Sequence, residues 1–331
     1  MVIFKIPGWI DLQVNGYKGV DFSSSDLTIK DIKFINRELL KAGTIGYCPT
    51  IISTSVGVYK QNLSLISKVM EMDEKEGANI LGVHLEGPFI SKKDGVRGIH
   101  PKKHIRSPSI EFFRRLSDWA NQKILLISLD PALGGALELI KHIKCKTNTV
   151  ISIGHSLANN NIIDEAIDLG LSAATHVSNG IPSMINRHKN PLWKILADER
   201  IFGLFITDGF HLPSEFILVA LKAKTPKKFI VTSDMVHLAG CKPGIYNLYD
   251  NDVILESNHH LHVKNSPYLA GSASTMNMSM NFLTKATSLD LKNYLQIGYS
   301  NPLRLLKKKT DIDQFHTLAK IKYRDKRFII S

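Results

Sequence analysis

The sequence predicts an α/β fold, a TIM-like (β/α)8 barrel with a reduced small β appendage. Three observations lead to this expectation. Eight short apolar runs of strand length recur along the 331 residues, and most of them end in a polar or glycine-rich turn. Segments with helical periodicity separate these runs. The repeat is about the 30 residues of a strand–helix–strand unit, and eight such units close into a barrel rather than an open sheet.

The third run anchors the arrangement, because Ile80–Leu85 is typical of a strand buried on both faces. His84 and Glu86 lie two residues apart and therefore on one face of this strand, and Gly87-Pro88 then breaks it. The eight expected strands are Trp9–Val14, Ile45–Ile52, Ile80–Leu85, Ile124–Leu129, Val150–Ile153, Ser172–Thr175, Ile201–Thr207 and Phe229–Thr232. The expected helices between them include Ile29–Lys41, Val58–Glu76, Ile110–Asn121, Asn161–Leu169 and Ser214–Ala223.

The chain after the eighth run departs from this repeat. Gly244–Val263 predicts a hairpin or small sheet, because Asn251-Asp252 and Asn258-His259 supply turn chemistry. Further on we expect helices over Met276–Thr287, over Leu291–Gly298 and from Asn301-Pro302, then one or two strands within Thr317–Ser331. The barrel domain is accordingly assigned to residues 7–243 and 264–313, and a residual small β subdomain to residues 1–6, 244–263 and 314–331.

Composition favours a globular protein of the cytoplasm. Hydrophobic residues make up 44% and charged residues 22%, enough for a sizeable core. No apolar run approaches the roughly 20 residues of a membrane span, so no membrane partner is expected. The first residues lack the length and cleavage site of a signal peptide. The three cysteines are odd in number and far apart, which argues against a disulfide framework or a cysteine-based zinc site.

The net charge of +12 admits two interpretations. Basic residues stand in scattered groups such as Lys92-Lys93 and Lys222–Lys228, which is typical of a solvated face. No arginine-rich helix, RNA-binding aromatic signature or zinc finger accompanies them. The excess fits the steering of an anionic small molecule about as well as it fits nucleic acid, and no nucleic-acid partner is expected.

Unusual polar residues follow the expected strands where the carboxyl ends of a parallel barrel would meet. They are Asp11, Gln13 and Asn15 in the first run, Glu86 after the third, His155 after the fifth, His176 after the sixth, Asp208 and His211 after the seventh, and Asp234 after the eighth. Active sites of such barrels assemble at this rim. Two imidazoles and one carboxylate, with a further position open for water, suit a catalytic transition metal. The favoured interpretation is a metal-dependent hydrolase.

An ordered set of motifs between Pro7 and Pro302 resembles the N-acetylglucosamine-6-phosphate deacetylases of the amidohydrolase superfamily. The motifs are Pro7-Gly-Trp-Ile-Asp-Leu-Gln-Val-Asn-Gly16, His84-Leu-Glu-Gly-Pro-Phe89, Gly154-His-Ser156, Thr175-His176, Asp208-Gly-Phe-His211, Thr232-Ser-Asp234 and Leu269-Ala-Gly-Ser272. The resemblance implies hydrolysis of the acetamide of N-acetylglucosamine 6-phosphate to glucosamine 6-phosphate and acetate, in amino-sugar catabolism. It also implies a homodimer.

The resemblance implies a role for each matching residue. Glu86, His155 and His176 match metal ligands, expected to hold one divalent metal per chain, zinc or iron(II). Asp234 matches the carboxylate that moves the water proton to the leaving amine, and His100 a histidine beside the substrate carbonyl. In the substrate-binding set, Asn179 and Gly180 match a loop that contacts the sugar, and His211 and Arg187 match a phosphate-binding pair whose arginine can come from the partner subunit of a dimer.

Several alternatives stay open at this point. His188 competes with Arg187 for the phosphate, and His84 is expected near the ligands rather than among them. Gln13 and Asn15 stand where a two-metal site would place imidazoles, so they are expected to hydrogen-bond near a single metal instead.

Three departures from the family pattern qualify the expected activity. Pro7 stands almost at the start, the tail lacks the usual glycine-rich strand, and the loop after His176 reads Val-Ser-Asn-Gly-Ile. The first two departures bear on stability and dimerisation, and the third bears on sugar selectivity. The alternative functions are deacetylation of another N-acetylhexosamine phosphate, hydrolysis of a different amide, and a truncated, catalytically silent barrel.

Overall fold

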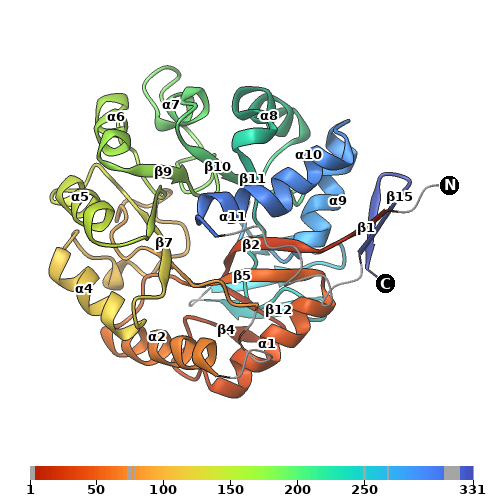
Figure 1. Ribbon diagram of the computed structural model, residues 1–331, viewed down its shortest axis with the longest axis horizontal. Helices are drawn as coiled ribbons and strands as arrows, with labels where there is room; N and C mark the ends of the chain where they lie inside the picture. The colour runs from red at the N-terminus through yellow and green to blue at the C-terminus, as the bar shows by residue number, and fades with distance from the viewer. Residues whose placement is uncertain are drawn as a thin grey trace.

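Eight parallel strands stand side by side in a computed structural model, and helices surround them (Figure 1). The structure describes residues 4–72, 77, 79–248, 251–266, 268–308 and 321–330. The strand order in the large sheet is β11-β10-β9-β8-β7-β6-β5-β2, so each strand pairs with its neighbour along the barrel. This is the predicted TIM-like (β/α)8 arrangement, and the prediction of fold class is confirmed.

The barrel strands are β2 (Trp9–Val14), β5 (Thr44–Ile51), β6 (Val83–Glu86), β7 (Ile124–Leu129), β8 (Val150–Ile153), β9 (Leu171–Ala174), β10 (Phe202–Phe205) and β11 (Phe229–Val231). The helices around them are α1 (Ile29–Lys41), α2 (Val56–Glu71), α4 (Ile110–Trp119), α5 (Ala136–Lys146), α6 (Asn160–Leu169), α7 (Pro191–Ala197) and α8 (Ser214–Lys228). A short 3-10 helix, η1, spans Lys102–His104, and a short hairpin joins β3 (Gly16–Tyr17) to β4 (Val20–Asp21).

Side-chain caps explain why several helices begin where they do. Thr28 and Asp31 form a reciprocal capping box at the start of α1. Ser55 and Ser109 accept a backbone N–H at the starts of α2 and α4. At α7, Asn190 caps a helix whose first residue, Pro191, has no N–H to satisfy.

The described elements differ from the predicted ones mainly at their ends. The third strand begins at Val83 instead of Ile80, and Ile80 forms only an isolated bridge with Tyr47. Helix α8 continues past Ala223 through a kink at Thr225 and Pro226. The expected helix Leu291–Gly298 is α10 (Leu291–Leu295) followed by a π-helical turn, η2 (Gln296–Ser300), that runs into α11 (Asn301–Leu305).

The barrel interior changes character from one end to the other. A buried apolar cluster fills its amino-terminal part, and η2 and α11 contribute to that cluster from below. Its members are Ile10, Leu12, Ile45, Cys48, Leu126, Val150, Ala173, Phe202, Leu204, Ile230, Tyr299, Leu303, Leu305 and Leu306. Above it, hydroxyl groups meet across the interior: Thr175 Oγ1 lies 2.6 Å from both Ser128 Oγ and Ser152 Oγ. The polar rim rests on this layer.

Backbone and side-chain bonds join the first strand of the sheet and the residues after it to the residues that follow the last strand. The N–H groups of Asn15 and Gly16 both donate to the carbonyl of Met235, at 2.9 and 3.3 Å. Below them, the buried Asp11 carboxylate accepts hydrogen bonds from the hydroxyls of Thr232 and Ser233. These contacts close the barrel between β2 and the residues after β11.

Two separate three-stranded antiparallel sheets accompany the barrel, where a single β subdomain was expected. One joins β1 (Phe4–Ile6), β15 (Ile321–Arg324) and β16 (Arg327–Ile330), and the other joins β12 (Gly244–Leu248), β13 (Asn251–Leu255) and β14 (Leu261–Val263). Strands form within 244–263 as predicted, but Asn251-Asp252, expected in a turn, begin β13 and pair with β12. Among the described strands, those of 244–263 pair only with one another. The division into a barrel and a β subdomain stays a prediction, and residues 309–320 lie outside the described part.

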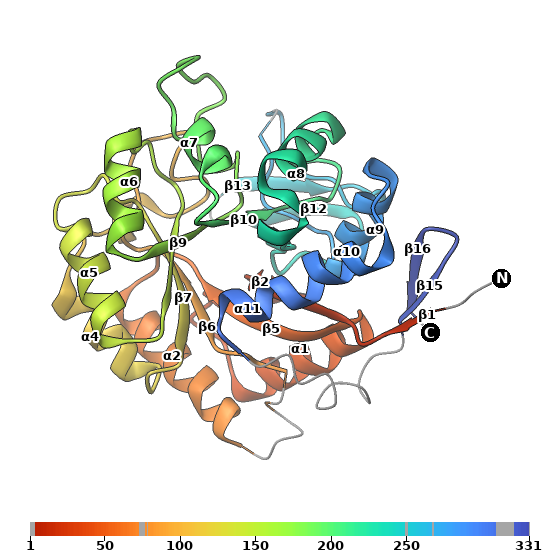
Figure 2. The same ribbon diagram turned by 45° about the horizontal axis from the view of Figure 1, so that its top comes forward.

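The terminal sheet packs against the barrel through aromatic rings. Phe328 of β16 meets Trp9 of β2 edge to face, with centroids 4.7 Å apart. Asn277 of α9 (Met276–Ala286) accepts from the Trp9 indole N–H and donates to the Phe328 carbonyl. In Figure 2, β15 and β16 stand at the edge of the barrel beside α9 and α10.

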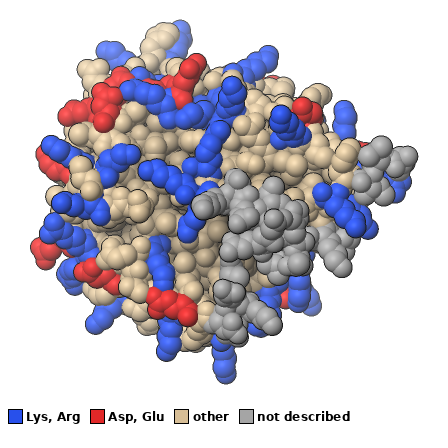
Figure 3. Space-filling view, in the orientation of Figure 1, with Lys and Arg blue, Asp and Glu red and all other residues tan. Residues whose placement is uncertain are grey.

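The charge of the surface and the length and apolar character of the helices bear on which partners the protein could have. Lys and Arg side chains are spread over the face shown in Figure 3, among fewer Asp and Glu. Among the described helices, none has the length and apolar character needed to cross a bilayer.

Candidate active site

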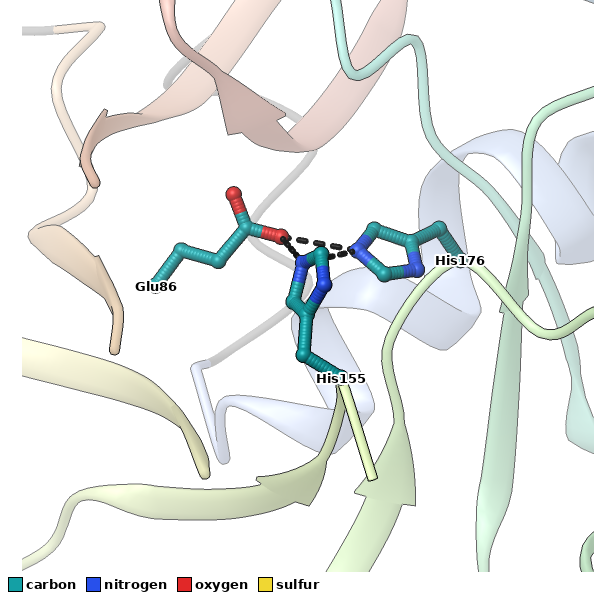
Figure 4. A group of neighbouring side chains, drawn as sticks. All are labelled: Glu86, His155 and His176. Carbon is teal, nitrogen blue, oxygen red and sulfur yellow. Dashed lines mark hydrogen bonds and ion pairs between the residues drawn. The ribbon is translucent and has the colours of Figure 1, made fainter. Parts of the chain in front are cut away.

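Three predicted metal ligands meet at the carboxyl-end rim of the barrel (Figure 4). Glu86 ends β6, His155 follows β8 and His176 follows β9, and all three are buried. Glu86 Oε1 lies 3.1 Å from His155 Nε2 and 2.8 Å from His176 Nε2. Within the part of the chain that the structure describes, these three residues form the one cluster suited to a metal.

The protonation of His155 indicates that this cluster needs a cation. Nδ1 of His155 lies 2.7 Å from the Val96 carbonyl oxygen, a contact that requires a proton on Nδ1. In the neutral ring, the lone pair of Nε2 then faces the Glu86 carboxylate and, at 3.1 Å, Nε2 of His176. Lone pairs directed at one another are satisfied by a positive charge placed between them. A divalent metal fits this donor set.

The carboxylate of Glu86 sets the local electrostatics. Burial disfavours its charge, but the neighbouring imidazoles of His100, His155 and His176 hold the pKa of Glu86 well below its usual range. Burial alone would lower the pKa of His176, and the hydrogen bond and charge of Glu86 instead raise it to about 9. The site therefore attracts positive charge, as a cation-binding centre must.

Left-handed backbone conformations occur at three residues of the site. The φ angles are 51° at His155, 31° at His176 and 51° at Asp234. Such values are uncommon outside glycine and carry a conformational cost that the surrounding fold must offset. Each of these residues directly follows or lies near the end of a barrel strand, so the turn redirects its side chain from the strand line into the rim.

Gly180 approaches the two imidazoles closely enough to exclude a side chain. A Cβ at Gly180 would lie 2.9 Å from His155 Nδ1 and 3.1 Å from His176 Cε1, and its φ is 66°. The neighbouring Asn179 has an amide nitrogen that is buried without a hydrogen-bond partner among the described residues. The predicted sugar-binding loop therefore lies directly over the candidate metal ligands and presents a free donor there.

The amides of Gln13 in β2 and Asn15 directly after it hydrogen-bond beside the ligands, in the place predicted for them. Gln13 Nε2 donates to Glu86 Oε1 at 2.9 Å, and Asn15 Nδ2 donates to Asp234 Oδ1 at 2.7 Å. The remaining amide oxygens, Gln13 Oε1 and Asn15 Oδ1, are buried without partners among the described residues. Such orphaned acceptors suit an additional proton donor in the site.

Asp234 belongs to the same site, and the charges of Glu86 and His176 affect its pKa. Burial and the negative charge of Glu86 raise the pKa of Asp234 to about 7. The charges of His176 and His211 and the hydrogen bond from Asn15 act in the opposite direction. A carboxyl group with such a pKa exchanges a proton readily near neutral pH.

The structure places His100 in the site, beside Glu86 and His155. Nε2 of His100 lies 3.6 Å from Glu86 Oε2, and its ring centroid is 4.6 Å from that of His155. The Ser53 N–H donates to Nδ1 at 3.2 Å, so Nδ1 carries the lone pair and Nε2 the proton. Burial lowers the pKa of His100 to about 4 and keeps the ring neutral. Sequence reasoning missed Ser53, whose only signal was its place after the second strand.

His211 is fixed by Asp208, which lies in the loop after β10. Asp208 Oδ1 accepts the backbone N–H of both Phe210 and His211, and Oδ2 lies 2.8 Å from His211 Nδ1. Ser272 Oγ also donates to Oδ2. Because Asp208 holds Nδ1, the Nε2 edge of His211 is the one available to a ligand.

Arg187 and His188 are not brought to the cluster. Both are exposed in the loop at 181–190, and within the described residues the Arg187 guanidinium has no hydrogen bond or ion pair. The Arg187 carbonyl accepts from the Trp193 indole.

His84 lies near the ligands without being one of them, as predicted. Its Nδ1 faces the Leu12 carbonyl at 3.0 Å and its Nε2 faces Ser128 Oγ at 2.8 Å. Ser128 in turn contacts Thr175, the residue before His176. His84 thus connects the strand of one ligand to the strand end of another.

The sequence and fold were compared with known proteins. No protein-family model matches the chain. It is 29% identical over 308 residues to the N-acetylglucosamine-6-phosphate deacetylase of Bos taurus, which covers 91% of this chain and 74% of the relative. It is 28% identical over 303 residues to the enzyme of the same name from Bacillus subtilis, covering 91% and 75%.

Solved structures of the same name share the fold. The Pasteurella multocida protein has a TM-score of 0.82 at 25% identity and covers 98% of this chain and 83% of its own. A Mycobacterium smegmatis mutant in complex with N-acetyl-D-glucosamine-6-phosphate has a TM-score of 0.86 at 20% identity, covering 99% and 85%. The resemblance to N-acetylglucosamine-6-phosphate deacetylases that the motifs indicated is confirmed.

Proposed function

We propose that this protein hydrolyses the acetamide of N-acetylglucosamine 6-phosphate to glucosamine 6-phosphate and acetate, as a step of amino-sugar catabolism. The observation that carries the proposal is the meeting of Glu86, His155 and His176 beside Asp234 and His100 at one rim. The similarity to deacetylases over 91% of the chain supports it. We propose one divalent metal per chain, zinc or iron(II). A second metal would have only the amides of Gln13 and Asn15 as additional ligands, and amides bind such metals weakly.

A divalent metal held by Glu86, His155 and His176 would supply Lewis-acid polarisation and a water of lowered pKa. The proton chemistry belongs to Asp234. Its carboxylate takes a proton from the attacking water and delivers it to the nitrogen as the carbonyl C–N bond breaks, since an amine anion cannot leave unprotonated. A pKa of about 7 suits both halves of this transfer.

His100 assists at the carbonyl oxygen of the substrate. The Ser53 N–H fixes its tautomer with the proton on Nε2, so that the ring is a neutral donor aimed into the site. A donor that is oriented before the reaction stabilises the negative charge that develops on this oxygen. His100 therefore complements the carboxylate of Asp234 without competing for its proton.

Substrate binding is assigned to the residues around this centre. The unpartnered amide of Asn179 and the backbone of Gly180 contact the sugar, and His211 contacts the phosphate through Nε2. Arg187 completes the phosphate site from a second subunit. Its exposed loop carries Met184, which is 88% exposed, and lies beside Trp193, which is 51% exposed. Exposed apolar residues of this kind suit contact with a partner. We therefore propose a homodimer. Its compartment is the cytoplasm, consistent with three free cysteines.

The test measures acetate release and metal content on one preparation. Metal-loaded protein should turn over N-acetylglucosamine 6-phosphate and should favour it over N-acetylglucosamine. His211→Ala and Arg187→Ala should raise KM for the phosphorylated sugar and matter less for the unphosphorylated one. Equal rates on both sugars would remove the phosphate assignment. Preference for another N-acetylhexosamine phosphate would change the substrate, and no turnover with metal bound would favour a silent barrel.

A further inference from the structure

Three rings are stacked beside the candidate phosphate end, outside the metal cluster. His260 lies between Phe210 and His262, with ring centroids 4.8 Å from each and interplanar angles of 20° and 26°. Phe210 belongs to the loop after β10, whereas His260 and His262 come from the β13–β14 hairpin. The stack is therefore a contact between the small sheet and the rim of the barrel.

The hairpin holds His260 in place. Glu256 N–H donates to the His260 carbonyl at 2.9 Å, and His260 N–H donates to Asn258 Oδ1 at 3.0 Å. Glu256 Oε1 also lies 3.3 Å from Nε2 of His262, the lower ring of the stack. With both faces covered by rings, His260 has only its edge free for polar contacts. Within the described residues, neither of its ring nitrogens has a hydrogen-bond partner.

The stack shares its base with the candidate phosphate contact. Phe210 and His211 are consecutive, and their N–H groups both donate to Asp208 Oδ1. Since His260 stacks on Phe210, the residue next to His211, the two imidazoles belong to the same part of the rim. Burial and the neighbouring His262 lower the pKa of His260, so its ring is a neutral donor and acceptor that an anion can recruit.

We propose that His260 determines specificity for phosphorylated substrates by contributing a second imidazole to the phosphoryl group beside His211. This inference rests on the proposed function of the site. The stack on Phe210 and His262 orders the ring in advance, so little rotamer freedom is lost when a phosphate oxygen binds. His262, whose Nε2 faces Glu256, supports the ring and does not contact the ligand.

Two substitutions separate binding from packing. His260→Phe keeps a flat ring in the stack and removes both nitrogens, whereas His260→Ala removes the ring as well. His259→Asn is the matched control, because His259 is exposed in the same turn and its φ of 72° is one that Asn tolerates. Steady-state kinetics with N-acetylglucosamine 6-phosphate and with N-acetylglucosamine, together with calorimetric titration of inorganic phosphate and glucosamine 6-phosphate, give two independent readouts.

The expected result is a rise of about tenfold in KM for the phosphorylated sugar in His260→Phe, matching the loss of one charge-assisted hydrogen bond. KM for the unphosphorylated sugar and both kcat values should stay unchanged, and His259→Asn should behave as the unaltered protein. A His260→Phe variant with unaltered KM, or one that loses both sugars equally, overturns the proposal. If only His260→Ala is impaired, the ring positions the loop and does not bind phosphate, which also overturns it.

The failure of the proposed function gives a different pattern. An unaltered protein that turns over neither sugar contradicts the deacetylase assignment, and the calorimetric titrations then decide the role of His260 alone. Weaker binding of inorganic phosphate by His260→Phe than by His259→Asn supports the second imidazole. Equal affinities of these two variants overturn it.

Discussion

The two ends of the barrel interior are built from the same strands and have opposite chemistry. At the amino-terminal end, Leu126, Val150 and Leu204 join an apolar cluster that admits almost no solvent. At the other end, Glu86 and the imidazoles that face it are also buried, but every one is tied to a polar partner. Burial is common to both ends, and hydrogen bonding distinguishes them.

The change from apolar to polar side chains occurs between two successive inward-facing residues of a strand. In β7 the inward residues are Leu126 and then Ser128, and after Ala173 of β9 the next inward residue is Thr175. The hydroxyls between the two ends satisfy one another and His84, so the apolar cluster never faces an unpaired charge. Stability and chemistry are therefore separated along the strand direction, and substitutions at the two ends should have different effects.

The largest expected effect is at the polar end. Asp234→Asn keeps the acceptor for the Asn15 amide but removes the group that carries the proton. We expect kcat for deacetylation to fall on the order of a hundredfold or more, with substrate binding and metal content retained. Single-turnover acetate release is the measurement. An unimpaired variant would show that another group moves the proton.

A substitution in the apolar cluster tests the difference between the two ends from the amino-terminal end. Leu204→Ala removes a fully buried side chain from the amino-terminal cluster and should cost about 2–5 kcal/mol of unfolding free energy. Because this cluster lies below the hydroxyl layer, kcat should stay within about twofold of the unaltered value. Denaturant titration and kinetics on the same preparation check both expectations. A fall in kcat like that of Asp234→Asn would mean that the ends are coupled.

A polar substitution that leaves the three ligands intact should have an intermediate effect. Gln13→Ala removes the amide that donates to Glu86 Oε1, and we expect metal affinity to drop about 10–100-fold. Competition with a chelator of known affinity measures this. Gln122→Ala, at an exposed amide after α4, is the control and should leave metal affinity unaltered. Equal metal affinities of the two variants would contradict a role for Gln13.

The smallest expected effect is outside the barrel interior, at the ion-pair group of α7. Arg200 and Lys194 contact the Asp198 carboxylate, and the hydrogen bonds from Arg200 lead in lowering the pKa of Asp198. A lowered pKa stabilises the fold at pH values above the ordinary carboxyl pKa, and this contribution is lost as the pH falls through the lower folded value. Asp198→Asn should therefore cost about 1 kcal/mol at neutral pH after screening by solvent.

The pH dependence provides the check on this last prediction. The difference between Asp198→Asn and the unaltered protein should be constant above about pH 4 and shrink in more acidic solution. Urea titrations across this range measure it. A difference that grows in acid would have the wrong sign for an ion-pair origin.

Much of the barrel could be predicted because its signals are local. The strands Trp9–Val14, Ile124–Leu129 and Val150–Ile153 and the helix Ile29–Lys41 have the predicted bounds, since apolar runs and capping residues fix them within the segment itself. Glu86, His155 and His176 were predicted from their place at strand ends, because a parallel barrel gathers all such ends at one rim.

Other features depend on contacts between distant segments and escaped prediction. The termini pair with each other and not with residues 244–263, because the pairing of short edge strands depends on the surface they pack on, here Trp9 and α9. The contact between His260 and Phe210 has no signal in the sequence, since the two residues lie 50 positions apart. Left-handed turns at His155 and His176 likewise have no glycine or asparagine to signal them.

The seam between β2 and the residues after β11 has a consequence for how the protein is made. Asn15 bonds Asp234 across 219 positions, and Asp11 bonds Thr232 across 221. A ribosome delivers the first strand long before its partner, so the edge of β2 waits unpaired while most of the barrel emerges. Asp234, the carboxylate of the proposed chemistry, belongs to the same segment after β11 that bonds this edge. A nascent or truncated chain therefore has both an open edge and an incomplete site, and the two defects end together.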